Sequence, residues 1–197
     1  GLLGGFILAG AVAAGIFLWS GRGGQPPAPA TGDELHVAVL DRVQHRTFAD
    51  ATALLDGHLA ESQRLLDSGK LSDAIARFRE VTRAAGDAAK ALRESPEGGP
   101  DARLFEAREA RSRAGVVMAM MRRWDAAAAS AEERRPPPAR EAEEAAQEIG
   151  LGLKLVPADG ALFFLKGVLA FWDGRPAAAA DALEQAIRIQ PRRAEAY

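Results

Sequence analysis

The stretch FWDGRPAAAADALEQAIRIQP, Phe171–Pro191, contains the clearest structural signal in this chain. It holds four consecutive alanines, Ala177–Ala180, and alanine has the highest helix propensity of all residues. Gly174 and Pro176 precede this run; glycine is common just after a helix, and proline at the first position of one. Pro191 prevents the second helix from continuing. The stretch therefore predicts two helices joined by a tight turn, with small side chains that allow close helix packing.

Another proline, Pro157, stands 34 residues before Pro191, and this spacing is the length of a common helical-hairpin repeat. Within this period, small, apolar and proline residues occupy the signature positions of the repeat: Gly167, Gly174, Ala179, Leu183, Ala186 and Pro191. The segment Leu162–Pro191 therefore resembles a tetratricopeptide (TPR) repeat. The resemblance implies a hairpin of two helices that stacks on neighbouring hairpins.

Two weaker copies precede this repeat. Segment 54–86, LLDGHLAESQRLLDSGKLSDAIARFREVTRAAG, brings four residues into register: Gly69, Ala74, Phe78 and Val81. Segment 108–133, REARSRAGVVMAMMRRWDAAAASAEE, brings another four into register: Gly115, Met118, Ala127 and Ala131. Trp124 is predicted to open its second helix. Glycine and proline in segment 90–103, and three prolines in segment 134–140, interrupt the stacking. Another helix is predicted over Glu141–Val156. We thus predict a TPR-like domain over residues 49–197, with Tyr197 where a further repeat would begin.

The segment before these repeats is also predicted to be helical. Leu35, Val37, Val39 and Val43 are compatible with a short strand, but Leu35, Val39, Leu40 and Val43 also share one face of a helix from Glu34 to Phe48. No convincing alternating strand pattern follows. The predicted fold class is therefore all-α, with a connecting helix over residues 33–48.

The first twenty residues, GLLGGFILAGAVAAGIFLWS, carry no charged side chain. About 20 apolar residues are enough to cross the bilayer as a helix, so we predict a transmembrane anchor over residues 1–21; a cleaved signal peptide is the alternative. Gly5, Ala9 and Ala13 recur at every fourth position, the spacing that lets two helices approach closely in lipid. A Gly/Pro/Ala linker over residues 22–32 follows.

Composition excludes several kinds of chemistry. The chain has no cysteine, three histidines and a net charge of −2. Thiolate metal sites and cysteine nucleophiles are therefore impossible, and the charge gives no reason to expect nucleic acid as a partner. None of the histidines stands four residues from another, and we interpret them as structural. We nominate no catalytic residue, no cofactor and no metal site, and we expect the protein not to be an enzyme.

The TPR resemblance implies a partner-binding face on the first helix of the strongest repeat. The family positions correspond to Phe164, Val168, Phe171 and Trp172. Because a helix that is apolar all round must be covered by something, a partner could cover Phe164 and Trp172. Core packing is the alternative for Phe171 and Trp172. Val116–Met121 is predicted to be core. The glutamate- and arginine-rich segments 131–135 and 139–148 are predicted to be solvated helix faces.

These expectations describe a non-enzymatic, membrane-anchored TPR scaffold that binds and stabilises other subunits of a membrane complex. Its partners would be protein subunits at the TPR surface, transmembrane helices and the lipid bilayer. There are two alternatives. The protein could be an accessory subunit of a respiratory or photosynthetic electron-transfer complex that contacts an extrinsic cytochrome, or an assembly factor of the cell envelope. The expected location is the bacterial inner membrane, with one span and a periplasmic soluble domain.

Overall fold

The computed structural model describes residues 32–95, 98–127 and 136–191, and all regular secondary structure in these ranges is helical. The helices are α1 (Gly32–Gln44), α2 (Phe48–Asp67), α3 (Leu71–Arg93), α4 (Gly99–Ala127), α5 (Ala139–Leu155), α6 (Gly160–Trp172) and α7 (Pro176–Ile189). The predicted all-α class is therefore confirmed. The described helices include none that is long and apolar enough to cross a bilayer, and the predicted anchor, with Gly5, Ala9 and Ala13, lies outside the described residues.

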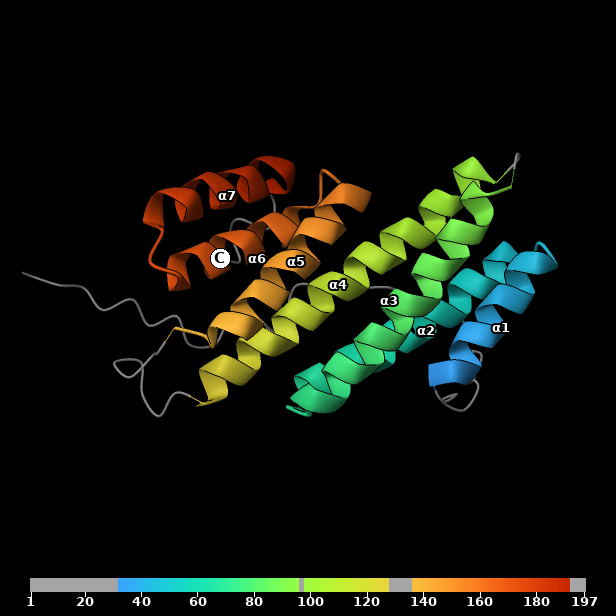
Figure 1. Ribbon diagram of the computed structural model, residues 1–197, viewed down its shortest axis with the longest axis horizontal. Helices are drawn as coiled ribbons and strands as arrows, with labels where there is room; N and C mark the ends of the chain where they lie inside the picture. Colours follow the sequence, from blue (N-terminus) through green and yellow to red (C-terminus); the bar gives the residue numbers. More distant parts are fainter. Residues whose placement is uncertain (1–31, 96–97, 128–135, 192–197) are drawn as a thin grey trace, which may run out of the picture.

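The helices form an elongated, ladder-like stack (Figure 1). Each described helix packs against the next one along the chain. Further contacts join only helices that are two apart, namely α1 with α3, α2 with α4, and α4 with α6. Packing restricted to near neighbours is the pattern of a helical solenoid.

The last hairpin, α6–α7, follows the sequence prediction closely. Gly174 has a φ of +69° in the turn, a conformation that glycine adopts without a steric penalty, and Pro176 is the first residue of α7. Ala179, Ala182 and Ala186 are buried. A Cβ added at Gly167 would lie 2.6 Å from Leu183 Cγ. The small residues therefore allow the two helices to pack closely.

The hairpin α2–α3 is also formed as predicted. The connection spans only residues 68–70, between Asp67 and Leu71, and Gly69 has a φ of +77° there. Ala74, Phe78 and Val81 of α3 are buried in the core. The weaker copy predicted over segment 54–86 thus corresponds to a real helical hairpin.

The prediction for the middle copy is wrong. Trp124 does not open a second helix, because α4 runs without interruption from Gly99 to Ala127. Segment 116–127 contains neither glycine nor proline, so nothing in it ends the helix. The helix that pairs with α4 on its C-terminal side is α5, which begins directly after Pro138.

Helix α1 belongs to the stack. It ends at Gln44 instead of Phe48, which is the first residue of α2. Leu35, Val39 and Val43 of α1 are buried, and α1 packs against both α2 and α3. Its apolar face therefore closes the N-terminal end of the described core.

Helices α3 and α4 share the most extensive contact in the described part of the chain. Gly115 of α4 faces the ring of Phe78, and an added Cβ would lie 2.4 Å from Phe78 Cε1. One turn earlier, the Ser112 hydroxyl donates a hydrogen bond to the Phe78 carbonyl oxygen. The two helices thus pack at closest range where α4 carries small side chains.

Candidate functional site

The predicted partner surface lies on α6. The carboxylate of Asp159 caps this helix by accepting hydrogen bonds from the backbone N–H groups of Ala161 and Leu162, at 2.8 and 3.0 Å. Lys166 is the only charged residue in α6. Leu162, Leu165, Leu169 and Ala170 are buried. This burial leaves the opposite side of an apolar helix for the four predicted residues.

Those four residues have different environments. Phe164, Val168 and Trp172 are half-buried and pack against the core, whereas Phe171 is 66% exposed. Because an exposed phenylalanine ring leaves a large apolar area in water, Phe171 is the member most available to a partner. The other three are half-buried residues of the same helix that add apolar surface to its flank.

Trp172 is tied to a neighbouring helix by an aromatic pair. Its ring lies edge-on to that of Trp124 in α4, with ring centroids 5.9 Å apart and an interplanar angle of 63°. The Trp124 indole N–H donates to Glu141 Oε2 of α5 at 2.5 Å. This bond, together with that from Arg123, holds the pKa of the Glu141 carboxyl below its usual value. Trp172 therefore joins α6 to α4, and Trp124 in turn joins α4 to α5.

The methionine-rich segment Val116–Met121 lies in the core, as predicted. Val116, Val117 and Met120 are almost completely inaccessible, and Met118 is half-buried against the same cluster. The segment therefore contributes packing to α4.

The acidic segment 139–148 is only partly a solvated helix face, because three of its carboxylates pair with other helices. Glu141, Glu144 and Glu148 of α5 pair with Arg123, Arg79 and Arg113, which belong to α4 and α3. The Glu148 side chain is 19% exposed. These carboxylates connect helices, although the Glu141 and Glu144 side chains keep exposures of 32% and 40%. Segment 131–135 lies outside the described residues.

Among the described residues, no three His, Asp or Glu side chains lie close enough to hold a metal ion together. His36 and His45 have side-chain exposures of 26% and 71%, whereas His58 of α2 is buried. Its Nδ1 has no hydrogen-bond partner in the described part of the chain. Burial, reinforced by the positive charge of Arg77, holds the pKa of His58 below 6.5, against the smaller opposing effects of Glu61 and Glu80.

This burial predicts acid destabilisation. The unfolded chain binds a proton on His58 at higher pH than the folded chain does, so stability contributed by neutral His58 is complete above pH 6.5 and is lost as pH falls through and below that value. Urea unfolding at pH 7.5 and 5.5 measures the effect. His58→Gln should show a smaller acid loss than wild type, whereas His45→Gln should retain the full loss. Equal losses in all three proteins would contradict the prediction.

Comparison of the chain with protein-family models, with curated proteins and with solved structures gives no match.

Proposed function

We propose that this protein is a non-enzymatic, membrane-anchored helical-repeat scaffold of the TPR type, which binds partner proteins of a membrane complex. The exposed ring of Phe171 carries the proposal. Aromatic side chains contribute strongly to binding energy when a partner removes them from water. The half-buried flank of Phe164, Val168 and Trp172 adds apolar surface around it.

The stacking of the helices supports the same function. Each described helix packs only on near neighbours, and a solenoid built in this way offers an extended surface to a partner. The uncharged segment of residues 1–20 would hold this surface at the bilayer. Gly5, Ala9 and Ala13 would contact transmembrane helices of the complex.

Replacement of Phe171 by alanine should lower recovery of a partner about tenfold while the protein stays folded. An interface residue of this kind is worth more than about 1 kcal/mol, but its ring contributes little to the core because it is largely exposed. The measurement is affinity purification of the full chain from native membranes in mild detergent, with quantification of the stoichiometric partner and circular dichroism on the same sample.

Val37→Ala is the matched control, because Val37 is another exposed apolar side chain, 64% accessible, on the distant helix α1. It should leave partner recovery unchanged. Equal recovery with wild type, Phe171→Ala and Val37→Ala would refute the proposed surface.

A further inference from the structure

In this stack, the first helix of a pair covers both helices of the pair before it. Helix α4 contacts both α2 and α3, and α6 contacts both α4 and α5. The last described pair, α6–α7, has no such covering helix in the described part of the chain, and α7 contacts only α6 there. Figure 1 shows α7 at the end of the stack. One side of this pair is therefore open to a helix from outside the described residues.

The open side carries two exposed apolar side chains, one from each helix. Phe171 of α6 is 66% exposed, and Ile187 of α7 is 49% exposed. Leu183 of α7 lies against Gly167 of α6, where an added Cβ would meet Leu183 Cγ at 2.6 Å. Phe171 and Ile187 each follow one of these contact residues by four positions, a step that turns a helix by about 40°. Because the two helices of the hairpin run antiparallel, this step turns both side chains to the same side of the pair.

The helix that covers the preceding pair shows what such a side accepts. Leu162, Leu165 and Leu169 of α6 stand at positions i, i+3 and i+7, and all three are buried. A Cβ added at Gly152 of α5 would lie 2.7 Å from Leu162 Cδ1, and Trp172, at position i+10, contacts α4. A stripe of large apolar side chains with this spacing, and with no charge among them, therefore covers two helices at once.

A second copy of this chain offers no free stripe of this kind in its described helices. Each of them exposes at most one large apolar side chain, and these are Val37, Leu104, Leu151, Phe171 and Ile187. The leucine stripe of α6 is itself buried in the contact with α4 and α5. This distribution favours a covering helix from a different protein.

We propose that the side of α6–α7 bearing Phe171 and Ile187 binds one amphipathic helix of a partner protein. The apolar side chains of that helix recur at i, i+3, i+7 and i+10 with no charge among them, as they do in α6. The inference rests on the function proposed above, because Phe171 belongs to both. It adds that the partner is helical at this contact and spans α6 and α7, in the position that α4 and α6 take on the pairs before them.

Ile187→Glu should lower recovery of the partner about tenfold, because the new charge would be buried without an ion pair. The measurement is affinity purification of the full chain from native membranes, with circular dichroism on the same sample. Leu151→Glu is the matched control, since Leu151 of α5 is 42% exposed, and it should recover the partner as wild type does. Normal recovery with Ile187→Glu, or an equal loss with Leu151→Glu, overturns the inference. If Phe171→Ala still lowers recovery in that case, the proposed function stands without it.

Photo-crosslinking identifies the occupant directly. The photoreactive residue p-benzoyl-phenylalanine replaces Phe171 or Ile187 in the full chain, and linked peptides from irradiated native membranes are sequenced by mass spectrometry. Both positions should link to one segment of a single partner, at residues about seven to eleven apart, because one turn of each helix separates the two positions from the Gly167–Leu183 contact. Links within the same chain, or to a ¹⁵N-labelled second copy, overturn the inference. Links to two different proteins, or no link from position 187, also overturn it.

Discussion

Replacement of Arg113 by methionine is expected to lower the free energy of unfolding by about 3–5 kcal/mol, because it strands two largely buried carboxylates. Arg113 of α4 donates to Glu109 at 2.7 Å and to Glu148 of α5 at 2.5 Å. The three side chains are only 15%, 10% and 19% exposed. Burial alone would lower the pKa of Arg113, but hydrogen bonds and charges of both glutamates outweigh it and raise that pKa. The triad therefore contributes strongly to the α4–α5 interface.

Urea unfolding monitored by circular dichroism measures this loss. Arg175→Met is the matched control, since the Arg175–Asp173 pair is exposed and should be worth less than about 1 kcal/mol. Adding Glu109→Gln and Glu148→Gln to Arg113→Met should restore much of the stability, because the remaining side chains are then neutral. Comparable losses for Arg113→Met and Arg175→Met would show that the triad is not effectively buried.

Replacement of Gly115 by leucine should cost about 3 kcal/mol, at the upper end of the usual range for overpacking. Its first side-chain carbon would lie 2.4 and 2.6 Å from Cε1 and Cδ1 of Phe78. That ring is itself buried, so it has little room to move. The α3–α4 contact would have to open.

Gly57→Leu makes the same substitution in α2 and should have the opposite sign. No atom lies within 4 Å of a Cβ added at Gly57, and leucine has a helix propensity better than that of glycine by up to about 1 kcal/mol. Phe78→Ala should also cost less in the Gly115→Leu background than in wild type, because the new side chain fills part of the space. Urea unfolding of these variants measures both effects. Similar stabilities for Gly115→Leu and Gly57→Leu would disprove the close approach.

Local sequence signals predicted the hairpins α2–α3 and α6–α7 well. Gly69, Gly174 and Pro176 determine where helices begin and end through backbone geometry alone, so a single stretch of sequence is enough to place them. The middle copy was misread because Ala127 and Trp124 fit the repeat register although no residue there breaks a helix. Residues that fit the positions of the repeat predict a turn only where a glycine or proline also ends the helix.

The candidate sites depended more on contacts between distant segments. The apolar stripe of α6 was visible in sequence, but only packing distinguishes exposed Phe171 from half-buried Trp172. The Trp124–Trp172 contact and the Arg113–Glu148 pair each join separate helices. From sequence alone, these charged residues fit solvated helix faces equally well. The helical period shows which residues share a face, but it does not show which other helix that face contacts.

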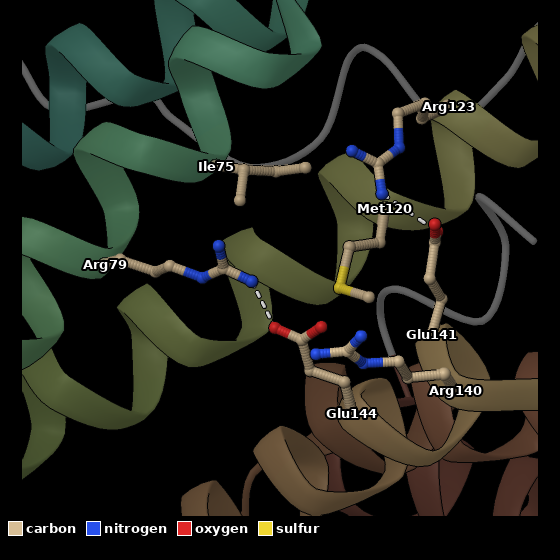
Figure 2. A pocket seen from close by; sticks show the side chains of 7 residues that line it. All are labelled: Ile75, Arg79, Met120, Arg123, Arg140, Glu141 and Glu144. Atoms are coloured by element: carbon tan, nitrogen blue, oxygen red, sulfur yellow. Dashed lines mark hydrogen bonds and ion pairs between the residues drawn. The ribbon is translucent and has the colours of Figure 1, made fainter.

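Helix α4 has a mechanical consequence for the whole molecule. It is the one described helix that packs against members of both the α1–α3 group and the α5–α7 group, and its 29 residues extend about 44 Å. The Arg79–Glu144 ion pair joins α3 and α5 directly, but it is exposed and therefore contributes little free energy. Bending of one group relative to the other is therefore resisted mainly by α4 itself. A change in the bend of α4 would therefore widen or narrow the gap between α3 and α5, where residues of α3, α4 and α5 line the pocket drawn in Figure 2.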